Sequence, residues 1–267
     1  MRMVGCIGCG NMGGAILGGL ADSLGGKGYA FCGHTRTPGR MALLTAKGVS
    51  VRPDAQSLVR DADVIVLAVK PYQIAAIVKE ILPALSGEKL LISIAAGVGL
   101  KRLKELCRGL CPVARCMPNT PAIVGQGIFA LCLEDDAMSR ENRDEAVALF
   151  NTLGLCIPLP ETQFTAFSAL IGAGPAYVFQ MMQGMVQAGV TLGFAHQEAR
   201  KLVTALFASS ARLAGERPEH LAQLRDTVCS PGGLTIAGVN VLDRAGIVGV
   251  LVDAVLAADK RGREMEE

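Results

Sequence analysis

One stretch near the start of the sequence has the residue types and spacing to bind an anion. Gly8, Gly10 and Gly13 form a G-x-G-x-x-G pattern between a short apolar run and a helical pattern. The glycines permit a tight turn and a close approach of backbone to a pyrophosphate, and the following helix points free N–H groups at it. We therefore predict a dinucleotide-binding loop. Its cofactor-binding residues are Ile7, Gly8, Gly10, Asn11, Met12 and Gly13.

The end of the second predicted strand indicates which dinucleotide binds. An NAD site has a carboxylate there, about 20 residues after the glycines, to bond the ribose 2′-OH. This chain instead has His34, Thr35, Arg36 and Thr37, with no carboxylate among them. A guanidinium can pair with a 2′-phosphate, and threonine hydroxyls can hydrogen-bond to it. We predict NADPH over NADH, with His34, Thr35 and Arg36 in contact with the cofactor. The open alternative is that Arg36 is an ordinary surface charge.

Three further strand ends carry residues suited to a ligand site, because ligands bind beyond the carboxyl ends of parallel strands. The first two loops hold small or basic residues that we predict to bind the cofactor: Ala68, Val69, Lys70, Pro71, Ala95, Ala96 and Gly97. Lys70 either contacts a phosphate or caps its strand. In the third loop, Pro118 and Pro121 stiffen a turn that displays Asn119. Together the three loops favour a nicotinamide crevice.

The elements that must position these loops alternate between strand and helix. We expect strands at 3–7, 29–33, 64–69, 90–94, 113–117 and 155–159, and helices at 11–24, 38–47, 71–82 and 141–153. The run VIVLAV at 64–69 is continuously apolar, as in a strand buried on both faces. This alternation predicts an α/β fold: an N-terminal Rossmann-type parallel sheet domain over residues 1–160.

The second part of the chain, residues 161–267, shows only helical periodicity, so we predict an all-helical domain. Residues 162–195 contain no charged side chain, which raises the question of a membrane span. Gln180, Gln183 and Gln187 share one helical face there. Such a polar stripe favours burial between protein surfaces over exposure to lipid. We therefore expect a core or subunit-interface helix and no membrane association.

The composition fits a cytoplasmic protein with a large core. Of 267 residues, 51% are hydrophobic and 19% charged, and the mixed charges sum to +2, which indicates no nucleic-acid surface. Nine cysteines and the absence of a signal-peptide pattern favour free thiols in a reducing compartment. Cys6 and Cys9 have the spacing of a redox or metal pair, but no second pair stands at metal-site spacing. Small buried side chains, with no metal, are the favoured interpretation.

The motifs together resemble the pyrroline-5-carboxylate reductase family along the whole chain. They are the glycine loop, VKP at 69–71, SIAAGV at 93–98, RCMPNTPA at 115–122, GAGPAY at 172–177 and SPGGLTI at 230–236. The last two are the most specific, because no general Rossmann rule requires them. The resemblance implies reduction of the C=N bond of 1-pyrroline-5-carboxylate to L-proline with NADPH or NADH. It also implies a helical domain that interlocks two subunits into a homodimer, with assembly of dimers into a decamer.

The resemblance also places the substrate against residues 230–235. It implies Thr235 and Ser230 as catalytic residues, with the Thr235 hydroxyl facing the ring nitrogen. The residues implied to bind substrate are Pro231, Gly232, Gly233 and Asn119. The chain departs from the common family pattern at Ala173, Cys229 and Leu234, and a leucine at the rim would narrow the substrate pocket.

Three other functions were weighed against this one. A β-hydroxyacid dehydrogenase shares the two-domain plan but needs a lysine early in its second domain, and 162–195 has none. A reductase of a related cyclic imine remains open. A non-catalytic NADPH-binding regulator would have little use for Ser230, Gly232, Gly233 and Thr235.

Overall fold

A computed structural model describes residues 1–266, so residue 267, the last of the predicted second domain, lies outside the described residues. The chain forms two compact units. The sheet unit comprises Met1–Ala173 with the C-terminal segment from Asp259, and the helical unit comprises Gly174–Ala258. The domain boundary at residue 160 stays a prediction.

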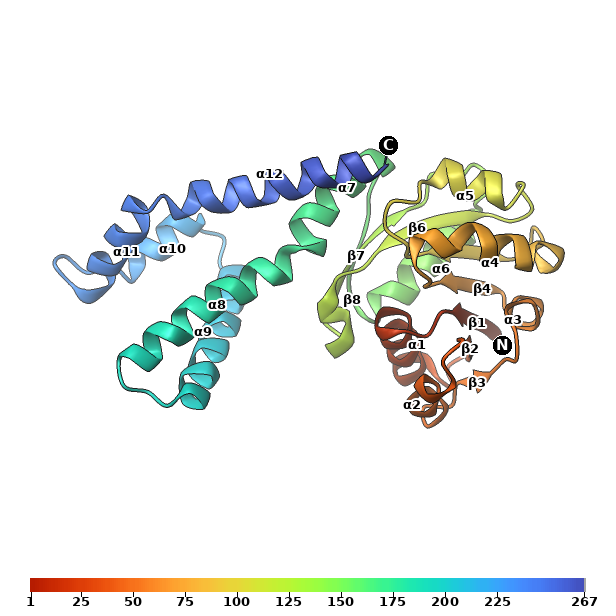
Figure 1. Cartoon of the computed structure of the whole chain (residues 1–267), viewed down its shortest axis with the longest axis horizontal. Coiled ribbons are helices and arrows are strands. Elements are labelled where there is room, and N and C mark those ends of the chain that lie inside the picture. The colour runs from red at the N-terminus through yellow and green to blue at the C-terminus, as the bar shows by residue number, and fades with distance from the viewer. Residues whose placement is uncertain (267) are drawn as a thin grey trace. The chain divides into compact units, whose positions relative to one another are not determined.

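The sheet unit is built on an eight-stranded sheet with the order β3-β2-β1-β4-β5-β6-β7-β8 within the described residues (Figure 1). The strands are β1 (Arg2–Ile7), β2 (Tyr29–His34), β3 (Ser50–Val51), β4 (Val64–Leu67), β5 (Leu90–Ser93), β6 (Val113–Met117), β7 (Gly127–Cys132) and β8 (Gly154–Pro158). Neighbouring strands are parallel except for the antiparallel pair β6 and β7. Only the 3₁₀ turn Thr120–Val124 joins that pair. It is too short for a crossover, so the chain returns beside β6 in the opposite direction.

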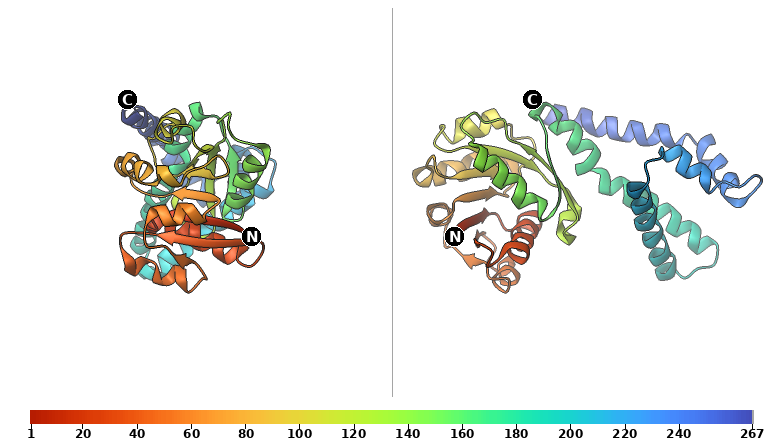
Figure 2. Two further views of the ribbon diagram at one scale, coloured as in Figure 1. Left: turned by 90° about the vertical axis from the view of Figure 1, so that its right-hand side faces the viewer. Right: turned by 180° about the vertical axis from the view of Figure 1, so that it is seen from behind.

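Helices cover both faces of this sheet. They are α1 (Asn11–Leu24), α2 (Ala42–Thr45), α3 (Ala55–Asp61), α4 (Ile74–Ile81), α5 (Leu100–Leu106), α6 (Arg140–Asn151) and α7 (Phe164–Phe167). In β4, Val64 and Val66 face the core shared with α1 and α6, whereas Ile65 and Leu67 face α3, α4 and α5. This two-sided burial explains the continuous apolar run of β4. Helix α4 lies in front of the sheet in Figure 1, and α6 lies in front in the view from behind in Figure 2.

The topology creates a binding edge at the start of the sheet. Strand β1 pairs with β2 on one side and with β4 on the other, so the strand order reverses next to β1. Ligands bind at such a switch point, outside the carboxyl ends of the strands. The glycine loop, residues 8–13, follows β1 at this position.

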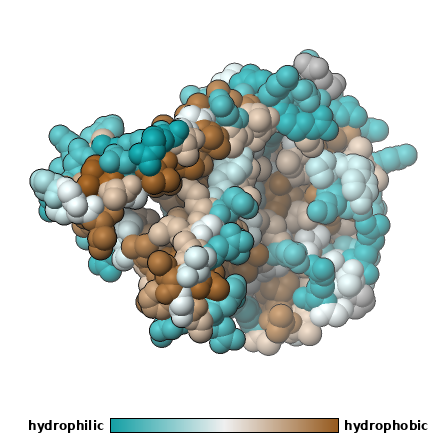
Figure 3. Space-filling model, turned by 60° about the vertical axis from the view of Figure 1, so that its left-hand side comes forward, coloured by the Kyte–Doolittle hydropathy of each residue, from teal (hydrophilic) through white to brown (hydrophobic). Residues whose placement is uncertain are grey.

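The helical unit has a small core of its own. Its helices are α8 (Gly174–Thr191), α9 (His196–Glu216), α10 (Leu221–Thr227), α11 (Leu234–Arg244) and the greater part of α12 (Ile247–Glu266). Helices α8 and α9 pack together through Val186, Ala199 and Val203. Many large apolar side chains stay exposed, among them Phe179 at 60%. Figure 3 shows the corresponding brown surface on the helices that come forward. Among residues 1–266, no helix has the length and apolar content to cross a membrane.

Several elements differ from the sequence-based expectations. The predicted helix 38–47 is wrong: Pro38–Arg40 form a 3₁₀ turn and only Ala42–Thr45 are α-helical. Gly39 lies within this stretch, and glycine disfavours helix interiors. Four elements were not predicted: β3, α3, α5 and β7. Helices α3 and α5 have only seven residues each, and β3 has two, which is too few for a periodic pattern to stand out.

Candidate active site

A pocket of about 890 Å³ opens at the carboxyl edge of the sheet unit, within the size range of ligand sites. It collects the loops after β1, β2, β4, β5 and β6. All the residues predicted to bind the cofactor line it except Gly97, namely Ile7, Gly8, Gly10, Asn11, Met12, Gly13, His34, Thr35, Arg36, Ala68, Val69, Lys70, Pro71, Ala95 and Ala96. Gly97 follows directly after Ala96 and has a φ of +70°. Met117 and Pro118 also line the pocket.

The glycine loop has the geometry that its spacing predicts. Gly8 has a φ of +96°, and a Cβ there would lie 2.7 Å from the Ala68 carbonyl oxygen. A Cβ at Gly13 would lie 2.6 Å from Ala68 Cβ and closer still to the Gly8 carbonyl oxygen. Gly10 is the N-cap of α1, and no side chain caps this helix end. The loop therefore presents bare backbone and a helix N-terminus to the pocket, which fits a pyrophosphate.

Two arginines stand at the same side of the pocket. Arg36, predicted from the sequence, lines it, and so does Arg40, which the sequence analysis missed. Arg40 Nη1 donates a hydrogen bond to Asn11 Oδ1 at 2.8 Å, so this side chain reaches across the glycine loop. Arg40 lies within the stretch 38–47 that was predicted to be a helix, and a charged residue on a helix is most simply interpreted as a surface charge. The signal was a second basic residue four positions after Arg36, on a turn that follows the second strand.

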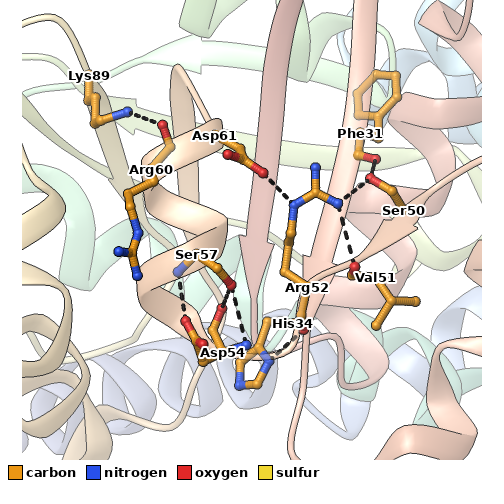
Figure 4. Close-up of polar contacts among 10 residues, drawn as sticks. All are labelled: Phe31, His34, Ser50, Val51, Arg52, Asp54, Ser57, Arg60, Asp61 and Lys89. Carbon is orange, nitrogen blue, oxygen red and sulfur yellow. Dashed lines mark hydrogen bonds and ion pairs between the residues drawn. The ribbon is translucent and has the colours of Figure 1, made fainter.

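His34 is held at the end of β2 by a polar cluster (Figure 4). Its Nδ1 lies 3.1 Å from the Arg52 carbonyl oxygen. Because a carbonyl oxygen only accepts, Nδ1 must carry a proton, which leaves Nε2 as the second polar atom of the ring. Arg52 is fixed in turn by Asp61, whose Oδ2 lies 2.7 Å from Nε, and by Ser50. The imidazole therefore has a fixed orientation beside the pocket.

The cysteine pair below the glycine loop consists of free, buried thiols. Cys9 Sγ donates to the backbone oxygens of Cys6 at 3.5 Å and His34 at 3.8 Å. The interaction with Cys9, together with burial, raises the pKa of the Cys6 thiol well above its usual range. A protonated, buried thiol is a small packing group and a poor nucleophile.

The turn predicted to hold the substrate lies in the helical unit, between α10 and α11. The Gly233 N–H donates to the Ser230 carbonyl oxygen at 3.0 Å, and Gly232 has a φ of +67°. A Cβ at Gly233 would collide with Ser230 Oγ, so a larger residue at this position would force the Ser230 side chain to move. Gly233 is also the N-cap of α11, without a side-chain cap. Thr235 lies in the first turn of α11, and Leu234 beside it is 96% exposed.

Asn119 is the one predicted substrate-binding residue in the sheet unit, and its side chain is hydrogen-bonded within that unit. It is buried and does not line the described pocket of the sheet unit. Its Oδ1 accepts from the Ile128 N–H at 2.9 Å, and its Nδ2 donates to the Ile171 carbonyl oxygen at 3.5 Å. These two bonds fix the orientation of the amide and leave one N–H of Nδ2 and one lone pair of Oδ1 for a further partner. A substrate role for Asn119 stays a prediction.

Fold and pocket together define a Rossmann-type oxidoreductase, and comparisons with known proteins agree. Residues 3–97 match the family model "NADP oxidoreductase coenzyme F420-dependent", and residues 161–265 match "Pyrroline-5-carboxylate reductase dimerisation". A pyrroline-5-carboxylate reductase of Escherichia coli is 33% identical over 100% of this chain and 99% of its own length. One from Synechocystis is 36% identical over 98% of this chain and 97% of its own.

Solved structures give the same result. A pyrroline-5-carboxylate reductase from Coxiella burnetii has a TM-score of 0.89 at 31% identity, covering 99% of this chain and 98% of its own. A pyrroline carboxylate reductase of Plasmodium falciparum, solved with NADP bound, has a TM-score of 0.87 at 27% identity, covering 100% and 98%. The chain belongs to the pyrroline-5-carboxylate reductase family. Membership confirms the predicted fold class, the reaction and NADP as the cofactor, and it makes the helical part a region of oligomerisation.

Proposed function

We propose that this chain reduces 1-pyrroline-5-carboxylate to L-proline with a cofactor held by the sheet unit and a substrate held by the Ser230–Thr235 turn. The observation that carries the proposal is the pocket of about 890 Å³ at the carboxyl edge of the sheet, which is lined by the glycine loop and by two arginines. In functional terms, residues 1–160 form the NADP-binding domain and residues 161–267 the domain for dimerisation and substrate binding.

The residues of the pocket fit a dinucleotide phosphate. The amides at the start of α1 bind the pyrophosphate. Arg36 and Arg40 pair with the 2′-phosphate, and His34 and Thr35 border the same end of the pocket. Ala95, Ala96 and Gly97 are small enough for a flat ring to lie against their backbone. When bound, NADPH supplies the hydride that reduces the imine carbon.

The substrate turn supplies an anion site and a hydroxyl group for the ring nitrogen. The amides of Gly232 and Gly233, next to the uncapped start of α11, hold the carboxylate. Pro231 stiffens the turn, and Ser230 closes it through its carbonyl oxygen. The Thr235 hydroxyl oxygen accepts a hydrogen bond from the N–H of the protonated, more electrophilic imine and keeps it in place. The chain then needs no strong general acid, because the imine takes its proton from water.

Assembly and location complete the proposal. The exposed apolar side chains of the helical unit support a homodimer formed through this unit, with further assembly into a decamer. The many free cysteines of the chain support a reducing compartment, the cytoplasm.

Steady-state kinetics of Thr235→Ala test the substrate turn. Loss of the hydroxyl should lower kcat about 10²-fold, the size of effect that removal of one hydrogen bond to the reacting group has elsewhere. The Kd for NADPH should stay within about twofold, because the cofactor binds to other residues. Thr204→Ala is the matched control: the Thr204 hydroxyl, also in the helical unit, bonds only the Arg200 carbonyl oxygen. Unchanged kcat in Thr235→Ala would remove Thr235 from the mechanism.

A further inference from the structure

Three segments of the sheet unit meet at one carboxylate. Glu161 Oε1 accepts a hydrogen bond from the Leu100 N–H at 2.5 Å and another from Arg115 Nη1 at 2.6 Å. Leu100 is the first residue of α5, directly after the loop 94–99. Arg115 lies on β6, whose carboxyl end reaches the pocket through Met117 and Pro118. The carboxylate therefore ties the loop after β5 to β6.

The position of this carboxylate is fixed from several sides. The Arg115 side chain is 8% exposed, and its guanidinium lies 4.9 Å from the ring centre of buried Phe164. A buried guanidinium requires an anionic partner, because the penalty for its desolvation is large. The backbone N–H of Glu161 donates to Glu134 Oε2 at 2.9 Å, which anchors the residue itself. Glu161 is thus restrained at both its backbone and its carboxylate.

No residue of the loop 94–99 supplies the hydrogen-bond acceptor that Glu161 offers to the start of α5. Gly99 is the N-cap of α5 and has no side chain to cap the helix. The Leu100 N–H instead finds its acceptor on a residue 61 positions away. At the other end of the loop, the Ala95 N–H is held by Ser93 Oγ at 3.3 Å. Between these two anchors stand Ala95 and Ala96, which line the pocket.

We propose that Glu161, held by Arg115, is a positioning residue for the cofactor: it fixes the far end of the loop 94–99 and thereby the backbone of Ala95 and Ala96 at the pocket. The residue touches neither reactant and acts through the loop. This inference rests on the proposed cofactor site, and it gives a functional role to a partly buried ion pair that otherwise has only a structural role.

Variants of Glu161 separate positioning from stability. Glu161→Ala removes the cap and the ion pair, and we expect the Kd and KM for NADPH to rise about tenfold, because a loop that is no longer preorganised must be ordered when the cofactor binds. Glu161→Gln keeps an oxygen for the Leu100 N–H, so the Kd should return to within about threefold of wild type. Glu161→Asp keeps the charge but is too short for the cap, and its Kd should rise like that of the alanine variant. Melting temperatures are measured on all three.

The matched control is Glu105→Gln on α5, which removes an exposed ion pair with Arg102. It should leave NADPH binding unchanged. If Glu161→Ala does not fold, the aspartate and glutamine variants carry the comparison. Lower melting temperatures with an unchanged Kd for NADPH would show a purely structural role and overturn the proposal. Arg36→Gln separates the positioning role of Glu161 from the proposed cofactor site. If Arg36→Gln weakens NADPH binding and the Glu161 variants do not, only the positioning role is wrong. If Arg36→Gln also leaves the Kd for NADPH unchanged, the proposed cofactor site is wrong as well.

Discussion

In the proposed site, Arg36 and Arg40 select the cofactor, because both arginines line the pocket and can pair with a 2′-phosphate. Charge-assisted hydrogen bonds contribute about 1.5–3 kcal/mol each, equivalent to about 10–100-fold in affinity. Arg36→Gln and Arg40→Gln should each raise the KM for NADPH by at least about tenfold. The KM for NADH should change little, because NADH has no 2′-phosphate.

Initial rates with both cofactors provide the measurement. Arg60→Gln is the control, since Arg60 is exposed on α3 and does not line the pocket. Equal effects on NADPH and NADH would mean that the arginines do not read the 2′-phosphate.

At the residue scale, residues that belong to a known motif can be predicted from the sequence. Residues that reach the site only through the folding of a turn or a long-range contact cannot. The glycines were predicted from the spacing of their motif, and Arg36 was predicted from its position just after the second strand. Arg40 and Glu161 were not predicted. The first depends on the fold of the 38–40 turn, and the second acts on Leu100, a residue 61 positions away. Such a long-range contact leaves no local pattern.

At the element scale, helix α1 offers a matched pair of glycines. Gly13→Ala would place a Cβ 2.6 Å from Ala68 Cβ and nearer still to backbone, so the loop must shift. We expect NADPH binding to weaken about tenfold or more, because the pyrophosphate needs the close backbone approach that this loop provides. Gly14→Ala places its Cβ 3.6 Å from the Cys9 carbonyl oxygen, an ordinary contact. That variant should bind NADPH normally and gain about 0.5–1 kcal/mol in stability. Fluorescence titration and thermal unfolding check both outcomes.

The connection between α5, β6 and the end of β7 depends on a buried carboxylate. Asp135 is 1% exposed, and it accepts from the N–H groups of Val113 at 2.9 Å and Ala137 at 3.1 Å. Lys104 Nζ lies 2.7 Å from its Oδ1. Burial raises the pKa of Asp135, but the bonds from Lys104, Val113 and Ala137 outweigh it and bring the pKa below its usual value.

A lowered pKa sets the direction of the pH dependence. The stabilisation by Asp135 is complete above its unfolded pKa of about 3.9 and is lost as the pH falls through the lower folded value. Asp135→Asn should lose about 1–3 kcal/mol at neutral pH and show a shallower loss of stability below pH 4. Asp136→Asn, at the exposed neighbouring position, is the control. Urea unfolding at pH 7 and pH 3 measures both; parallel pH curves for wild type and Asp135→Asn would contradict this role.

Elements were predictable where their pattern is long. Helices α1 and α6 and the buried strand β4 were located to within a few residues, because their periodicity or continuous apolar run is unambiguous. The antiparallel strand β7 was missed, although its residues GIFALC are strongly apolar. This strand follows the motif RCMPNTPA at 115–122, whose residues indicate a binding loop. Only a short turn separates it from β6, so it can pair with β6 only in the antiparallel direction.

At the scale of the whole molecule, the helical unit leaves large apolar side chains exposed, as expected of a unit that associates with other chains. Phe179 is 60% exposed on α8, in a unit whose own core is small. Phe179→Glu should weaken assembly and lower the melting temperature, because a charge at an apolar interface is left without a partner. Leu110→Glu, an equivalent change on an exposed loop of the sheet unit, should do neither. Light scattering at matched concentrations reads the outcome, and a wild-type mass for Phe179→Glu would exclude this surface from the interface.

The central claim is that the chain transfers hydride from NADPH to the imine carbon of 1-pyrroline-5-carboxylate. The most direct measurement uses NADPH deuterated at the transferring position, with mass spectrometry and NMR of the product. The account predicts L-proline with one deuterium, on the ring carbon that was double-bonded to nitrogen. Absence of proline, or proline formed without the deuterium, would contradict it.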